Sequence, residues 1–179
     1  MSPRTEGPDG SHHPDQIAVK PAHESGGRSL FDPALARLGM EASDKREAIS
    51  VLADALWAAG RVRESFLEAV LEREAEFPTG LPTPGSAIAI PHADVKHCIE
   101  PAVVVGALRD NVEFEEMGSP GSTLDVRIIF LLSITNPEDN VEWLSRLSSA
   151  FQTPQLAHRL LDAKSAVQAC RPLHDEIEG

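Results

Sequence analysis

His92 follows a short apolar segment and stands directly after a proline. The segment 87–90 reads AIAI, which is typical of a strand buried on both faces, and Pro91 ends ladder pairing because it has no N–H. Loops at strand ends display reactive groups, and imidazole changes its charge near neutral pH. On spacing alone, a turn with an exposed histidine is the simpler interpretation. His92 is therefore a candidate reactive group that needs further support.

Arg73 is a second residue with two interpretations. It falls in the last turn of a helix expected from about residue 63 to residue 74, where a cation complements the helix dipole and can pair with the carboxylate of Glu72, Glu74 or Glu76. A guanidinium also fits phosphate oxygens well, so Arg73 is suited to stabilise a phosphoryl group. The first, solvated role is the default on the sequence alone.

The segment after His92 carries two more side chains with reactive chemistry. His97 is explained as an exposed loop histidine, and Cys98 could pair with His92 as a nucleophile. Nothing in the neighbouring sequence supplies the third group that would orient such a pair. Cys98 and Cys170 lie far apart and lack the C-x-x-C spacing of a zinc or redox site. We therefore expect neither a metal nor a cofactor.

The pattern of apolar residues predicts the elements that position these side chains. Asp94 is expected to cap a short helical turn after His92. Helices are expected over 44–60, 63–74, 138–151, from 153 onward and over 165–170, and strands over 87–90, 101–108 and 124–134, with a short edge piece at 112–114. This order predicts an α/β domain whose mixed β-sheet is flanked by α-helices on both faces.

Composition limits the class of protein. Residues 1–28 carry four prolines and four glycines with almost no apolar side chains, so we predict a disordered tail there and one domain over 29–175. The formal net charge of -12 argues against binding to nucleic acid or to an anionic membrane surface. Neither a membrane-spanning run nor the apolar core of a signal peptide is present, so we expect a cytoplasmic protein without direct membrane insertion.

Two sequence motifs resemble those of a known family. The segments EREAEFPTG (72–80) and AIAIPHAD (87–94), joined by a short Pro/Gly linker, resemble the type-2 EIIA domain of the bacterial sugar phosphotransferase system. The resemblance is to the fructose/mannitol superfamily, closest to the galactitol type, and covers roughly residues 30–173. It implies the mannitol/fructose-type IIA fold. It also implies that His92 is the phosphorylated nucleophile and that Arg73 stabilises the phosphoryl group.

The resemblance also implies supporting residues around His92. Galactitol-type relatives carry a histidine at the position of His97, which would make it an auxiliary residue that holds the phosphoryl group or orients His92. Thr79 and Gly80 would offer a hydroxyl and an unobstructed amide to the same group. Mannitol-type and fructose-type relatives have a second site histidine in a motif like N-x-E-H. The corresponding segment of this sequence, 136–140, reads NPEDN and contains no histidine. Either the amide of Asn140 occupies the space that this second histidine fills in the relatives, or the site depends on His97.

The resemblance implies a place in a phosphoryl relay. A IIA component accepts a phosphoryl group from the phosphocarrier protein HPr, here on His92, and passes it to a cysteine of a IIB component. A membrane IIC component follows during uptake of a hexitol such as galactitol. One alternative is a regulatory nitrogen-type IIA homologue, which signals through phosphorylation-dependent protein binding. Another is an interaction module that keeps the fold without phosphorylation.

Overall fold

The computed structural model describes residues 29–179, so the tail predicted over 1–28 lies outside the described residues. Within them, five strands form one mixed sheet in the order β1-β4-β5-β3-β2. The strands are β1 (Arg37–Met40), β2 (Gly80–Leu81), β3 (Ala87–Ala89), β4 (Ala102–Glu115) and β5 (Thr123–Ser133). β4 and β5 are antiparallel, β1 runs parallel to β4, β3 runs parallel to β5, and β2 is antiparallel to β3.

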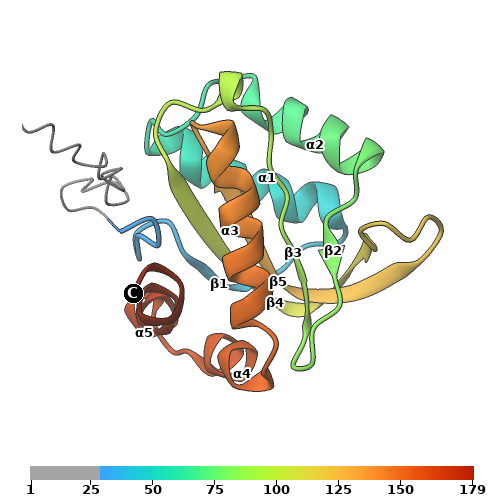
Figure 1. Cartoon of the computed structure of the whole chain (residues 1–179), viewed down its shortest axis with the longest axis vertical. Coiled ribbons are helices and arrows are strands. Elements are labelled where there is room, and N and C mark those ends of the chain that lie inside the picture. Colours follow the sequence, from blue (N-terminus) through green and yellow to red (C-terminus); the bar gives the residue numbers. More distant parts are fainter. Residues whose placement is uncertain (1–28) are drawn as a thin grey trace, which may run out of the picture.

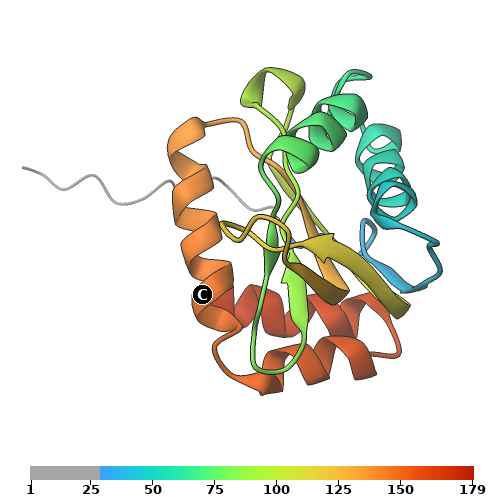
Figure 2. The same ribbon diagram turned by 90° about the vertical axis from the view of Figure 1, so that its right-hand side faces the viewer.

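Helices cover both faces of this sheet (Figures 1 and 2). One face packs against α1 (Lys45–Ala58) and α2 (Phe66–Glu76), and the other packs against α3 (Pro137–Ala150), α4 (Pro154–Asp162) and α5 (Ala166–Leu173). A short 3-10 turn, η1 (Val95–His97), follows β3, and a π-helical turn, η2 (His174–Glu178), follows α5. The predicted fold class, a mixed sheet between two helical layers, is confirmed.

The nearly uninterrupted apolar run of β5 reflects its place at the centre of the sheet. Ile128, Phe130 and Leu132 belong to the core cluster under α3, α4 and α5, whereas Ile129 and Leu131 belong to the cluster under α1 and α2. Successive side chains of a strand point to opposite faces, so a strand covered on both sides needs apolar residues at every position. Among the described helices, none is long and apolar enough to cross a membrane.

Three strand assignments differ from the expectation, and one of them is β2, whose two residues fall where a connecting loop is expected. β1 was absent from the predicted elements, because its four residues are too few for a clear pattern and Gly39 interrupts them with φ of 64°. The separate edge piece predicted at 112–114 is wrong, because these residues continue β4. The pairing of β4 with β5 shifts register between Ala107 and Val112, and the polar residues between these positions hide the continuity in the sequence.

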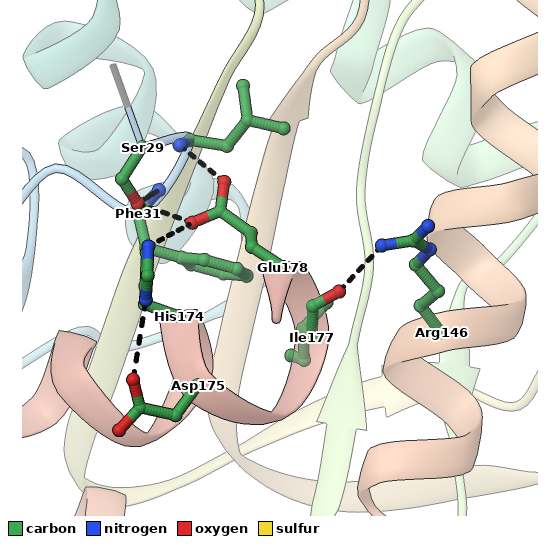
Figure 3. Close-up of polar contacts among 8 residues, drawn as sticks. Ser29, Phe31, Arg146, His174, Asp175, Ile177 and Glu178 are labelled. Atoms are coloured by element: carbon green, nitrogen blue, oxygen red, sulfur yellow. Dashed lines mark hydrogen bonds and ion pairs between the residues drawn. The ribbon is translucent and has the colours of Figure 1, made fainter. Parts of the chain in front are cut away.

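The side chain of Glu178 joins the beginning and the end of the described domain (Figure 3). Its Oε1 accepts a hydrogen bond of 2.7 Å from the backbone N–H of Leu30, and its Oε2 accepts one from the hydroxyl of Ser29. Nearby, the guanidinium of Arg146 on α3 donates to the carbonyl of Ile177 at 2.8 Å. These contacts, which we call the terminal clasp, fix η2 against the first described residues.

Removal of the clasp should measurably destabilise the fold. We expect Glu178→Ala to lower the free energy of unfolding by about 1–2 kcal/mol, because two hydrogen bonds to a carboxylate are lost at a largely buried position. Glu176→Ala is the matched control, since that carboxylate forms a solvent-exposed ion pair with Arg159 and should contribute less than about 0.5 kcal/mol. Denaturant unfolding measures both values, and equal effects would contradict a stabilising clasp.

Candidate functional site

His92 lies where two parallel strands end. β3 ends at Ala89, and the pairing with β5 continues only through a single bridge between His92 and Leu132, with the backbone N–H of Leu132 donating to the Pro91 carbonyl at 3.1 Å. The residue is 9% exposed. The interpretation as a turn with an exposed histidine therefore does not describe this residue, and its imidazole must be explained by internal contacts.

Two hydrogen bonds define the tautomer of His92. Nδ1 lies 3.0 Å from the carbonyl oxygen of Ile90, which can only accept, so Nδ1 carries the hydrogen. Nε2 lies 3.2 Å from Nε of Arg73, which can only donate, so Nε2 accepts with its lone pair. Each contact independently requires the same tautomer. Nε2 is therefore the ring nitrogen that carries the lone pair, and it lies beside a cation.

The environment keeps this imidazole neutral. Burial is the largest influence and lowers the pKa of His92 below its ordinary value of 6.5. The hydrogen bond to Ile90 raises the pKa part of the way back, the charge of Arg73 lowers it, and the charge of Asp94 raises it. The net direction is downward, so at neutral pH the Nε2 lone pair is not lost to a proton.

This lowered pKa predicts the pH dependence of both activity and stability. We expect the rate of reaction at Nε2 to stay constant from neutral pH to pH 6.5 and to fall only at lower pH. The unfolded chain binds a proton at His92 more readily than the folded chain does, so stability is lost as pH falls below 6.5 until the folded pKa is passed. Titration of the His92 ring by NMR checks the direction, and a midpoint at or above 6.5 would contradict it.

Arg73 reaches His92 from the last turn of α2. Its Nη1 lies 3.3 Å from Oδ1 of Asp94, and the guanidinium carbon lies 5.6 Å from the centre of the Phe77 ring. Asp94 precedes η1 but makes no side-chain capping hydrogen bond to it, which corrects the expected capping role. Its carboxylate instead orients the guanidinium. The structure thus brings Arg73 and His92 together, with Asp94 holding the arginine from the other side.

A hollow of about 270 Å³ opens beside this guanidinium, between the end of α2 and η1. Its wall combines apolar, cationic, imidazole and carboxylate side chains: Ala69, Glu72, Arg73, Glu76, Phe77, Asp94, Lys96 and His97. Arg73 both lines this hollow and contacts Nε2 of His92. The hollow is therefore the side from which a charged group can approach the guanidinium.

His97 lines the hollow and pairs with Ser65. Its Nδ1 lies 2.8 Å from Oγ of Ser65, and its carbonyl accepts a hydrogen bond of 2.9 Å from the backbone N–H of Arg63. These contacts tie η1 to the start of α2. A role of His97 toward a phosphoryl group or toward His92 stays a prediction.

Cys98 is buried and has its own partners. Its Sγ lies 3.9 Å from the carbonyl oxygen of Asp94. Burial is the largest influence on the thiol and raises the pKa of Cys98 above its ordinary value of 9.0. The thiol therefore stays protonated near neutral pH, which argues against the nucleophile pair with His92.

Thr79 and Gly80 are held by internal contacts. The hydroxyl of Thr79 donates to Oε2 of Glu74 at 2.7 Å and accepts from the backbone N–H of Ile90 at 3.1 Å. Gly80 begins β2, and a Cβ at this position would lie 2.5 Å from the carbonyl oxygen of Glu115, so only glycine fits. The hydroxyl hydrogen of Thr79 is thus already used. Contact of either residue with a phosphoryl group stays a prediction.

Asn140 lies in the first turn of α3, a few residues beyond the end of β5. Its Oδ1 is buried without a hydrogen-bond partner, alone among the buried side-chain oxygens and nitrogens of residues 29–179. Buried acceptors are nearly always paired, so this oxygen is available to a donor that enters from elsewhere. Support of a phosphoryl group by Asn140 stays a prediction.

The sequence reasoning missed the buried carboxylate of Glu74. This side chain is 2% exposed, although the residue lies in the motif EREAEFPTG with two other glutamates. Helical spacing places Glu74 one turn after the buried Val70, on the same face of α2. That spacing was the available signal, and the surrounding run of exposed charges concealed it.

Comparison with known proteins gives this site a family. Residues 29–175 match the sequence profile described as "Phosphoenolpyruvate-dependent sugar phosphotransferase system, EIIA 2". The chain belongs to this EIIA 2 family. It is 33% identical over 134 residues to the fructose-specific EIIABC component of Bacillus subtilis (strain 168), which is 72% of this chain and 20% of that protein. It is 28% identical over 125 residues to the galactitol-specific EIIA component of Escherichia coli (strain K12), covering 70% of this chain and 83% of that protein. The chain thus spans about a fifth of the first relative and most of the second.

Solved EIIA structures share the fold. The crystal structure of IIA mannitol from Escherichia coli is 26% identical, with a TM-score of 0.66 over 79% of this chain and 97% of that chain. The complex of enzyme IIA and phosphorylated enzyme IIB for mannitol from Escherichia coli is 24% identical, with a TM-score of 0.64 over 82% and 95%. Both agree with the layered α/β architecture of this EIIA 2 chain.

Proposed function

We propose that this EIIA 2 protein is a phosphoryl carrier that accepts a phosphoryl group from phosphorylated HPr on Nε2 of His92 and passes it to a IIB component. The observation that carries the proposal is the buried, neutral imidazole whose Nε2 lone pair lies beside the fixed guanidinium of Arg73. Family membership supplies the class of chemistry. Residues 29–175 are the domain that performs it.

The first transfer makes one bond to phosphorus and breaks another. The Nε2 lone pair of His92, once released from the hydrogen bond that Arg73 Nε–H donates to it, attacks the phosphorus. The bond to the donor's imidazole nitrogen breaks, so that nitrogen regains its electron pair. The hydrogen on Nδ1 stays in place, because the Ile90 carbonyl binds it and stabilises the positive charge that the ring acquires. Arg73 lies on the side where negative charge gathers on the phosphoryl oxygens, which is where a fixed cation accelerates such a transfer.

The second transfer reverses these roles. A cysteine thiolate of the IIB component attacks the phosphorus, and the electrons of the N–P bond return to Nε2 of His92. The same tautomer is restored, since Nδ1 never loses its hydrogen. The burial of His92, which lowers the pKa of its imidazole, also favours departure of the neutral ring from the phosphorus. The same site can therefore serve both directions of transfer without a change of protonation, with the Arg73 Nε–H returning to Nε2 when the phosphoryl group leaves.

We assign the sugar to the hexitol class, with galactitol as first choice. Three observations support this: the chain covers 83% of the galactitol-specific EIIA component, it has His97 five residues after His92, and the segment 136–140 contains no histidine. The carrier would act in the cytoplasm, with a membrane IIC component receiving the sugar downstream. HPr and the IIB component are its two direct partners, and the IIA–IIB pairing in the mannitol complex is the precedent for the second.

The test is a reconstituted relay. The purified protein is incubated with phosphoenolpyruvate, enzyme I and HPr, and intact-mass analysis is expected to find one acid-labile phosphoryl group. Omission of HPr is the control. Addition of a galactitol-type IIB component should then discharge the adduct faster than a fructose-type one. No adduct in the complete mixture would refute the carrier function, and an adduct that neither IIB component discharges would favour a regulatory role.

A further inference from the structure

A chain of hydrogen bonds connects the buried Glu74 to the imidazole of His92. Oε1 and Oε2 of Glu74 accept from the backbone N–H and the hydroxyl of Thr79, at 3.0 and 2.7 Å. The Thr79 hydroxyl oxygen accepts from the N–H of Ile90 at 3.1 Å, and the Ile90 carbonyl accepts from Nδ1 of His92 at 3.0 Å. Four residues from three segments are thus linked end to end beneath the reactive ring.

We propose that Glu74 and Thr79 are positioning residues for phosphoryl transfer: they fix the Ile90 backbone so that its carbonyl holds Nδ1–H of His92 and leaves Nε2 as the nucleophile. This inference rests on the proposed carrier function. Neither side chain contacts the reacting nitrogen. Their effect is on which tautomer His92 adopts and on the direction in which Nε2 points.

The backbone geometry explains why the Ile90 carbonyl needs such support. Ile90 follows the last residue of β3, and Pro91 has no N–H with which to anchor the chain. The Thr79 hydroxyl holds the backbone before the Ile90 carbonyl, and the Leu132 N–H holds it afterwards by donating to the Pro91 carbonyl. The carbonyl that selects the His92 tautomer therefore lies between two anchors, of which Thr79 is the one made by a side chain.

The direction of the hydrogen bonds makes Glu74 an ionised acceptor. Thr79 has one hydroxyl hydrogen, and its oxygen already receives the N–H of Ile90. If Glu74 were the donor, the Thr79 hydrogen would be left unpaired in the interior, which is costly. The carboxylate consequently sets the orientation of the Thr79 hydroxyl, and hydrogen bonds that are linked in this way strengthen one another.

The test compares Thr79→Val with Thr79→Ser in the full chain, using phosphorylated HPr as donor. Loss of the hydroxyl should lower the phosphoryl-transfer rate constant about tenfold or more, by analogy with hydrogen-bond partners that orient metal-binding histidines, with the KM for HPr unchanged. Thr79→Ser keeps the hydroxyl and should restore most of the rate. Thr83→Val is the matched control, because that hydroxyl donates to the Ser86 carbonyl in the loop between β2 and β3.

Glu74→Gln separates positioning from simple stabilisation. Burial raises the pKa of Glu74, so the amide removes an unfavourable buried charge, but it also leaves the hydroxyl hydrogen of Thr79 unpaired. These two effects oppose each other, and the melting temperature is expected to change little. Transfer should nevertheless slow severalfold, because an amide nitrogen donates to Thr79 instead of accepting from it. A residue that served the fold alone would give the opposite pattern, with lower stability and an unchanged rate per folded molecule.

The tautomer of His92 can be observed directly by NMR. Nitrogen-15 NMR of the His92 ring should report hydrogen on Nδ1 in the wild-type protein and a mixture of tautomers in Thr79→Val. Equal transfer rates in the valine and serine variants, with an unchanged Nδ1–H tautomer, would overturn the inference. Failure of the wild-type protein to accept a phosphoryl group is a separate result, because it would refute the carrier function itself.

Discussion

The His92→Gln variant is expected to take up no phosphoryl group from HPr. Glutamine can still donate to the Ile90 carbonyl, yet it offers no basic nitrogen, because its amide lone pair is delocalised. Intact-mass analysis after incubation with phosphoenolpyruvate, enzyme I and HPr measures the result, and thermal unfolding verifies that the variant is folded. His158→Gln is the matched control, since His158 is exposed on α4 and should leave uptake complete.

An adduct that persists in His92→Gln would contradict the assignment of the nucleophile. Peptide mapping would then identify the modified residue, and His97 is the first position to inspect because it lines the hollow beside Arg73. If His97 is only an auxiliary residue, His97→Gln should accept the phosphoryl group more slowly on His92 itself. The pair of variants therefore distinguishes a nucleophile from a neighbour that supports it.

The Arg73→Gln variant is expected to accept the phosphoryl group about 100-fold more slowly, because one preorganised cation beside the transferring group is lost. Arg73→Lys should recover part of the rate, since it restores the charge without the planar guanidinium whose Nε and Nη1 contact His92 and Asp94. Arg46→Gln removes the same charge from an exposed ion pair with Glu68 and is the control. Stopped-flow transfer from phosphorylated HPr measures the rates.

The same variant should shift the pH dependence. The charge of Arg73 lowers the pKa of His92, so its removal should move the acid limb of the rate profile to higher pH. A variant that disturbed only the binding of HPr would raise KM and leave that limb in place. Rates for Arg73→Gln and Arg46→Gln that agree within a factor of about two would contradict a role for Arg73 in the transfer.

The sequence was sufficient for the parts of the fold that carry strong periodic signals. The apolar run of β5 and the proline that follows Ile90 are local features, and they placed His92 at a strand end. Helix patterns placed Arg73 in the last turn of α2. The proximity of Arg73 and His92 could not be predicted in this way, because α2 and β3 are joined by two loops and the two-residue strand β2, whose path no local pattern specifies. The resemblance to a family supplied that contact.

Long-range polar partners were the part that could not be predicted. Asp94 was expected to cap η1, but the nearby guanidinium of Arg73 competes for its carboxylate. Glu74 was hidden in a charged run, and its partner Thr79 lies beyond the end of the helix. β1 was missed because a strand of four residues gains its stability from pairing with β4, which no short window contains. Each miss concerns a contact between segments rather than a property of one segment.

The terminal clasp has a consequence for how such a domain is attached to others. Because Glu178 binds Ser29 and Leu30, the chain enters and leaves the described domain at one point of its surface. Linkers fused to the two ends would therefore start side by side, and little entropy would be lost in closing a longer polypeptide around the domain. The same adjacency suits circular permutation, with new ends at the exposed turn that contains Gly118 and Gly121, where both glycines adopt positive φ.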